Sequence, residues 1–271
     1  LPMSATPIPR TLAQSLFGDM DVSIIAHRPS GRMPVTTHLV RSSSMGPILE
    51  EVLQKIDEGN QCYVVCPAIE KNEEMPMRNV TDIYQGMCSL LGKRYRIGLL
   101  HGKMSGEEKN EVMERFVRGE LDILVSTTVI EVGIDVKKAN LMVIYDAHRF
   151  GLSTIHQLRG RVGRGSQPGY CYLLTSSGDE EALQRLKMLE TLSDGFEISR
   201  YDLSLRGPGD LLGTRQSGVP GFVLGNVITD EKMMEAARSD AAYALQHLED
   251  EEYACLKPII EQDVKKSAYF D

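Results

Sequence analysis

The chain has 271 residues, of which 42% are apolar, and a net charge of −8 at pH 7. This length and apolar content support one large domain or two small ones with a buried core, and the negative total argues against nucleic-acid binding by bulk attraction. The five cysteines show no metal-ligand spacing, and no apolar run approaches the ~18 residues of a membrane-spanning helix. We therefore expect no metal site, no membrane association and a reducing compartment, the cytoplasm.

Charge is distributed unevenly along the chain. Residues 147–178 contain four arginines and no Asp or Glu, whereas residues 229–271 contain 11 acidic and 5 basic residues. We expect one basic surface and one acidic tail within the acidic total. The chain opens with LPMSATPIPR and has no initiator methionine. An apolar strand end that runs into S-A-T-P is typical of the middle of a domain, so we expect a fragment of a longer protein.

Strand and helix patterns alternate from residue 34 to residue 175. In chain order, VTTHLV alternates as a strand does, PILEEVLQKI has helical spacing, and QCYVVCPAI is the continuous apolar run of a strand covered on both faces. A later helix begins with a capping box of Ser105 and Glu108 and stops at Gly119. The expected strands are 35–40, 61–69, 95–102, 122–127, 141–146 and 170–175, and the expected helices are 47–56, 79–91 and 105–119. This order predicts an α/β fold, with a parallel sheet flanked by helices.

The pattern changes after Thr175. Residues 180–192 have helical spacing, 194–225 are Gly-rich and irregular, and 229–266 have the pattern of an acidic amphipathic helix. We therefore expect a mainly helical C-terminal extension beyond the sheet.

Four segments are expected at the carboxyl ends of the strands, where ligands of doubly wound sheets gather. They are LLHGKMS, STTVIEVGID, YDAHRFGLS and the arginine-rich HQLRGRVGRG. A guanidinium makes planar, two-pronged contacts with phosphate, and nearby glycines let a ligand approach the backbone. A solvated surface loop is the alternative for the arginine segment.

These segments resemble the motifs of superfamily 2 helicases. HQLRGRVGRG carries Gln-x-x-Gly-Arg-x-Gly-Arg, which resembles the sixth motif, and MSAT resembles the third. STTVIEVGIDV resembles the fifth motif, with Gly133 and Asp135 at the matching positions, and LLHGKMS resembles the segment between the fourth and the fifth. The four occur in the family's order.

Two further segments resemble the RecG branch-migration helicases: MSATPIPRTLAQSLFGDMDVSII and DLSLRGPGDLLGTRQSG. With them, the resemblance covers essentially the whole chain. The Mfd transcription-repair translocases share parts of these segments, but TRQSG and the Pro of RGPGD favour RecG. The resemblance implies a RecA-like fold in three parts. Residues 1–30 would be the tail of a first RecA-like domain, 31–178 a second RecA-like helicase domain, and 179–271 a C-terminal extension with a translocation helical hairpin and loop.

No stretch of the sequence fits G-x-x-x-x-G-K-[S/T], and no Asp-Glu-x-His box for magnesium is present. In the helicase family the nucleotide lies between two RecA-like domains, and the first provides the P-loop and the magnesium acid. The resemblance therefore implies that ATP and Mg²⁺ are bound mainly by a first motor domain outside this chain, and that the fragment alone is inactive. The arginines would remain unpaired within their own domain because they contact the γ-phosphate.

The resemblance assigns nucleotide roles to five positions. Arg164 would be the arginine finger, Arg161 a second phosphate contact, and Gln157 a residue that couples them to the nucleotide. Asp135, with Gly133 before it, would lie near the ribose or the catalytic water; helix capping is the alternative for Asp135.

Further positions would contact DNA or couple hydrolysis to movement. The implied DNA-backbone contacts are His101, Gly102, Thr127 and Thr128, and the implied coupling residues are Ser4, Thr6, Arg185, Arg206 and Gln216. Turn chemistry before Pro7 is the alternative for Ser4 and Thr6.

The whole protein would then be an ATP-dependent DNA helicase that moves on double-stranded DNA and remodels stalled forks and Holliday junctions in DNA repair and recombination. Its partners would be branched DNA and the N-terminal wedge and first RecA-like domain of the same polypeptide. The alternatives are an Mfd-like translocase and a non-catalytic RecA-like binding module.

Overall fold

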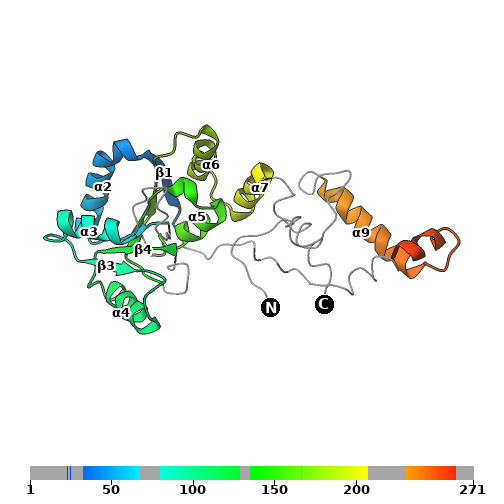
Figure 1. The fold of residues 1–271 in the computed structure, drawn as a ribbon, viewed down its shortest axis with the longest axis horizontal. Coiled ribbons are helices and arrows are strands. Elements are labelled where there is room, and N and C mark those ends of the chain that lie inside the picture. The colour runs from blue at the N-terminus through cyan, green and yellow to red at the C-terminus, as the bar shows by residue number, and fades with distance from the viewer. Residues whose placement is uncertain are drawn as a thin grey trace. The chain divides into compact units, whose positions relative to one another are not determined.

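The computed structural model describes residues 23, 25, 33–67, 80–128, 135–165, 167–206 and 230–260 (Figure 1). The described residues from Ser23 to Asp202 form one compact unit, and those from Leu203 onward belong to a second. The first unit contains the sheet and almost all of the predicted site residues that the structure describes.

A single sheet of six parallel strands forms the centre of the first unit, in the order β1-β6-β5-β2-β4-β3. The strands are β1 (Val35–Arg41), β2 (Gln61–Val65), β3 (Ile97–Leu100), β4 (Ile123–Ser126), β5 (Ala139–Ile144) and β6 (Gly169–Thr175). Because all six strands are parallel, their carboxyl ends share one edge of the sheet and their amino ends share the other. The predicted α/β fold with a RecA-like parallel sheet is confirmed.

Helices cover both faces of this sheet (Figure 1). Side chains of α2 (Met45–Asp57) and α3 (Val80–Leu91) pack on one face, with Cys62, Val64 and other alternate strand residues. Side chains of α4 (Gly106–Val117), α5 (Leu152–Arg159) and α6 (Glu180–Thr191) pack on the other face, with Tyr63 and Val65. Successive strand side chains point to opposite faces, so continuous apolar runs such as CYVVC fill two cores at once.

Most predicted elements occur close to their expected bounds. The capping box of α4 is present: the Glu108 backbone N–H donates to Ser105 Oγ over 3.2 Å, and the Ser105 N–H donates to Glu108 Oε2 over 2.7 Å. Hydrogen bonding of the Glu108 carboxylate to the backbone N–H and then to the hydroxyl of Ser105 lowers the pKa of Glu108.

Three predictions about helices were wrong. Residues 152–159 form α5, although the end of this stretch was expected to be a loop, because Leu152, Ile155 and Leu158 form a buried helical stripe between flanking glycines. Residues 195–206, expected to be irregular, form α7 (Gly195–Arg206). The expected helix over 229–266 is interrupted: α9 (Glu231–Gln246) ends before turns and a short 3-10 helix, η4 (Ala254–Leu256). Four consecutive acidic residues, 249–252, disfavour continuation because carboxylates oppose the dipole at a helix C-terminus.

Within the described ranges, no helix combines the length and apolarity needed to cross a membrane.

Candidate functional site

The predicted site residues lie at both edges of the sheet. His101 and Gly102 follow β3, and Thr127 and Thr128 follow β4, so these four lie at the carboxyl edge. Asp135 precedes β5, and the arginine segment precedes β6, so both lie at the amino edge. The prediction that all four segments share the carboxyl edge was therefore wrong. Helix α5 starts beyond the carboxyl end of β5 and crosses the sheet, which brings the arginines to the opposite edge.

The arginine segment packs closely on the starts of the strands. Gly163 has φ +67°, and a Cβ there would lie 3.2 Å from the backbone N of Gly169 and 3.3 Å from Val35 Cγ2. A Cβ on Gly165 would lie only 2.6 Å from the carbonyl oxygen of Lys137. Glycine is therefore required at both positions, and the segment is a closely packed turn instead of a solvated loop.

Arg164 has partners within its own domain. Its Nε donates to the Gly160 carbonyl over 2.9 Å, and its terminal nitrogen lies 3.7 Å from Asp135 Oδ1. The expectation that the predicted finger is unpaired was therefore wrong. The ion pair is long, and its side chains are 28% and 54% exposed, so it contributes little stability and can be exchanged for a more highly charged anion.

Tyr63 of β2 lies near three of the predicted nucleotide residues. Burial raises the pKa of the Tyr63 phenol to about 12, while the charges of Arg161 and Arg164 oppose this rise and that of Asp135 adds to it. The structure thus brings Arg164 and Asp135 into contact at the amino edge, and Arg161 lies three residues before Arg164 in the same segment. Gln157 lies half-buried on α5, one turn before Arg161.

A third arginine of the segment has a structural role that the sequence patterns did not indicate. Arg159 is 6% exposed, and its guanidinium donates to the carbonyl of Leu192 over 3.0 Å. It therefore connects the end of α5 to the residue that follows α6.

Two buried amides at the amino edge make structural hydrogen bonds that the sequence patterns did not indicate. Gln61 is 4% exposed, and its Nε2 donates to the carbonyls of Phe116 and Leu121, both over 2.7 Å. Asn140 is also 4% exposed, and its Nδ2 donates to Asn60 Oδ1 over 2.8 Å. The signal in the sequence was an amide at the start of an otherwise apolar strand, since buried polar groups need partners.

At the carboxyl edge, the strands β3 and β4 are neighbours, so the predicted DNA contacts lie close together. The Thr127 N–H donates to the Leu100 carbonyl over 3.2 Å, and the carbonyl of Gly102 accepts a hydrogen bond from Lys109 Nζ over 2.9 Å. The His101 N–H lies 3.4 Å from the sulfur of Met104, and its buried Nδ1 has no hydrogen-bond partner in the structure. Thr128 is half-buried.

Arg185 of α6 organises the turn after β5. Its guanidinium donates to the carbonyls of His148 over 2.6 Å and Phe150 over 3.4 Å. His148 Nδ1 lies 3.0 Å from Thr175 Oγ1 at the end of β6, and burial lowers the pKa of this histidine. The segment YDAHRFGLS is thus tied to α6 and to the neighbouring strand.

Other predicted residues cannot be placed in the site. Ser4, Thr6, Gly133 and Gln216 lie outside the described residues, and Arg206 is described only as the last residue of α7. Within the described ranges, no group of three or more His, Cys, Asp or Glu side chains could hold a metal ion.

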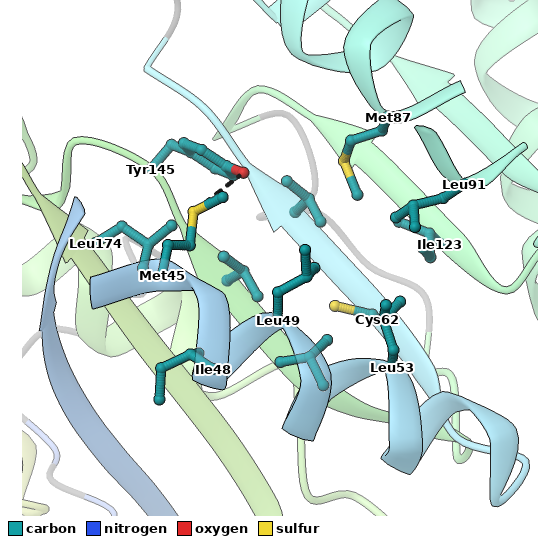
Figure 2. A pocket seen from close by; sticks show the side chains of 13 residues that line it. Met45, Ile48, Leu49, Leu53, Cys62, Met87, Leu91, Ile123, Tyr145 and Leu174 are labelled. Atoms are coloured by element: carbon teal, nitrogen blue, oxygen red, sulfur yellow. Dashed lines mark hydrogen bonds between the residues drawn. The ribbon is translucent and has the colours of Figure 1, made fainter. Parts of the chain in front are cut away.

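A pocket between α2, α3 and the sheet is lined almost entirely by apolar side chains, among them Leu49, Val64 and Met87 (Figure 2). A side-chain hydrogen bond between two lining residues joins the Tyr145 hydroxyl to the sulfur of Met45 over 3.8 Å. None of the predicted site residues lines it.

Family models match the two successive parts of the chain. The "Helicase conserved C-terminal domain" matches residues 46–166, and "ATP-dependent DNA helicase RecG, domain 3, C-terminal" matches residues 192–267. The first match contains all the described nucleotide and DNA candidates, and the second begins just beyond α6.

Individual relatives agree with these matches. The "ATP-dependent DNA helicase RecG" of Staphylococcus epidermidis (strain ATCC 12228) is 46% identical over 97% of this chain, which spans 39% of the relative. Its namesake from Staphylococcus aureus (strain Mu50) is 48% identical over 90% of this chain and 36% of its own length. A solved structure of RecG bound to a three-way DNA junction is 44% identical, with a TM-score of 0.68, over 86% of this chain and 30% of that chain. The chain therefore belongs to the RecG family of DNA helicases.

Proposed function

We propose that the whole protein is an ATP-dependent helicase that moves on double-stranded DNA and remodels forks and Holliday junctions in repair and recombination. This chain would provide its second motor domain, residues 31–178, between the tail of the first motor domain, 1–30, and the C-terminal extension, 179–271. The observation that carries the proposal is the cluster of Arg161, Arg164 and Asp135 at one edge of a sheet whose opposite edge bears the DNA candidates. The relatives named above support the same activity.

The proposed nucleotide site uses the arginines from this chain. Arg164 would exchange its long ion pair with Asp135 for the γ-phosphate of ATP, and Arg161 would make a second phosphate contact. The residues fit a phosphate ligand because Arg161 and Arg164 place two guanidiniums in one short segment, and Arg164 contacts the Asp135 carboxylate over a long 3.7 Å. The exchange would leave Asp135, with Gly133, to contact the ribose or the attacking water, and Gln157 would couple the arginines to the nucleotide.

ATP and Mg²⁺ would be bound mainly by a first motor domain, because the sequence has no P-loop or acidic magnesium box. Magnesium, when bound, would neutralise charge on the phosphates. A wedge domain, also outside this chain, would recognise the branch. We also propose a cytoplasmic location, where the free thiols of the five cysteines stay reduced.

The proposed DNA contacts lie at the carboxyl edge. The half-buried Thr128 and the exposed backbone at Gly102 are suited to phosphate oxygens, whereas Thr127 and the unpartnered His101 Nδ1 are buried and would have to become accessible on binding. Such contacts position a duplex without reading its sequence.

The proposed coupling residues are Ser4, Thr6, Arg185, Arg206 and Gln216. Arg185 supports this role because it connects α6, in the proposed extension, to the turn after β5, in the proposed motor domain. Substitution of Arg206 would impair movement on DNA more than hydrolysis.

The experiment that tests the proposal is steady-state ATP hydrolysis by the whole protein on branched DNA. Arg164→Ala should lower kcat by roughly 10³-fold or more, as expected for an arginine finger. Arg94→Ala is the matched control, because Arg94 is an exposed arginine whose ion pair with Asp57 involves none of the proposed site residues. Arg94→Ala should leave kcat within about twofold, since surface ion pairs contribute little. Unimpaired hydrolysis by Arg164→Ala would reject the proposed function.

A further inference from the structure

Strand β5 begins with a bulge at the amino edge of the sheet. Gln61 pairs with Ala139 and Cys62 pairs with Leu141, so Asn140 is an extra residue in the ladder. Its N–H donates to the carbonyl of Lys138 over 3.0 Å instead of joining the neighbouring strand. A bulge changes the direction of a side chain and is common beside functional sites.

The side chain of Asn140 joins two segments that are distant in sequence. Its Nδ2 donates to Asn60 Oδ1 over 2.8 Å and makes a longer contact, 3.4 Å, with Gln167 Oε1. Asn60 is itself fixed, because its own Nδ2 donates to the carbonyl of Lys55 over 2.9 Å. Asn140 is therefore a buried donor with one rigid acceptor before β2 and one acceptor three residues after Arg164.

The arginine segment has two more fixed points around Arg164. Gly163 packs against Gly169, and Gly165 packs against the carbonyl of Lys137, in the turn that leads from Asp135 into β5. The backbone that carries Arg164 is thus positioned by the first residues of β6 on one side and by residues 137–140 on the other.

We propose that Asn140 is a positioning residue for Arg164. By donating to both Asn60 and Gln167, its amide fixes the backbone of the arginine segment relative to β5, and so fixes where the guanidinium meets phosphate. Two donors on one planar group are needed, which an amide has and a carboxylate or hydroxyl lacks. This inference rests on the proposed function, in which Arg164 contacts the γ-phosphate. Asn140 itself would not touch the nucleotide.

The test is DNA-stimulated ATP hydrolysis by the whole protein carrying Asn140→Leu, which keeps the number and branching of the side-chain heavy atoms and removes both donors. A displaced Arg164 guanidinium would stabilise the transition state less, so kcat should fall about tenfold while KM for ATP changes less than about twofold. Gln61→Met is the matched control: it removes a buried amide at the same edge whose two hydrogen bonds go to the carbonyls of Phe116 and Leu121 and to no residue of the arginine segment. Gln61→Met should lower the Tm about as much and leave kcat within about twofold, because no reacting group depends on it.

The outcomes separate the inference from the function on which it rests. A fall in kcat with Asn140→Leu alone supports it. Unchanged kcat with Asn140→Leu, or an equal fall with Gln61→Met, would overturn it if Arg164→Ala still abolishes hydrolysis. Hydrolysis that survives Arg164→Ala would instead reject the proposed function. If Asn140→Leu does not fold, Gln167→Leu replaces it, because Gln167 is exposed; kcat should then fall about threefold, and an unchanged kcat would overturn the inference.

Discussion

The two edges of the sheet present different chemistry. The amino edge contains two guanidiniums and a carboxylate, held by close glycine contacts. The carboxyl edge beyond β3 and β4 presents threonine hydroxyls, a glycine backbone and a histidine. Two positioned guanidiniums suit a small, highly charged ligand such as the triphosphate of the proposed ATP. Neutral hydrogen-bond donors suit the proposed DNA, which a translocase must release and rebind at each step. The difference indicates that one rigid sheet can separate two phosphate ligands.

After removal of Arg164 itself, the largest effect should come from filling the close backbone contact of Gly165 at the amino edge. Gly165→Ala would place a Cβ 2.6 Å from the carbonyl oxygen of Lys137, a backbone atom, so the arginine segment must move. A displacement near 1 Å can reduce kcat about 100-fold. The measurement is DNA-stimulated ATP hydrolysis by the whole protein, with thermal unfolding as a check on the fold. Gly178→Ala, where a Cβ meets nothing within 4 Å, is the control. Comparable activity of the two variants would contradict the claim that close packing at Gly165 positions the arginine segment.

A smaller effect is expected at the carboxyl edge. Thr128→Ala would remove one hydroxyl that can donate to a DNA phosphate. The loss of one hydrogen bond, about 1 kcal/mol, should raise the DNA concentration for half-maximal ATPase stimulation about fivefold. KM for ATP should not change, because the proposed nucleotide site lies at the opposite edge. A DNA titration at saturating ATP measures the effect. An altered KM for ATP would contradict the proposal that nucleotide and DNA bind at opposite edges of the sheet.

The smallest effect should be on stability alone. Ser105→Ala removes half of the capping box at the start of α4 and should lower the free energy of unfolding by about 1 kcal/mol. Ser89→Ala is the control, because Ser89 bonds only the Gln85 carbonyl within its own helix. Denaturant unfolding compares the two, and a stability loss with Ser89→Ala as large as that with Ser105→Ala would argue against the cap.

The sheet could be predicted from the sequence because burial on both faces leaves a clear pattern. Runs such as QCYVV, DILVS and LMVIYD have no polar alternation, and each is followed or preceded by a helical pattern. The helicase motifs could be identified for a similar reason, since their glycines and arginines have narrow spacing requirements.

The positions of the motifs relative to the sheet could not be predicted in the same way. Placing the arginines required knowing that residues 152–159 are a helix, and flanking glycines concealed its short apolar stripe. The bulge at Asn140 left no pattern either, because it depends on the pairing of β5 with β2. The ion pair of Arg164 with Asp135 joins residues 29 positions apart and likewise follows from tertiary structure.

Complementation of ATP hydrolysis tests most directly whether arginines of this chain complete the nucleotide site. This chain, alone or with branched DNA, should show no appreciable turnover. Adding the separately purified N-terminal portion of the whole protein should produce DNA-stimulated hydrolysis, and an Arg164→Ala version of this chain should not. That result would support a nucleotide site completed by arginines of the amino edge. Turnover by this chain alone that survives Arg164→Ala would contradict the account, because it would require a nucleotide site elsewhere in the chain.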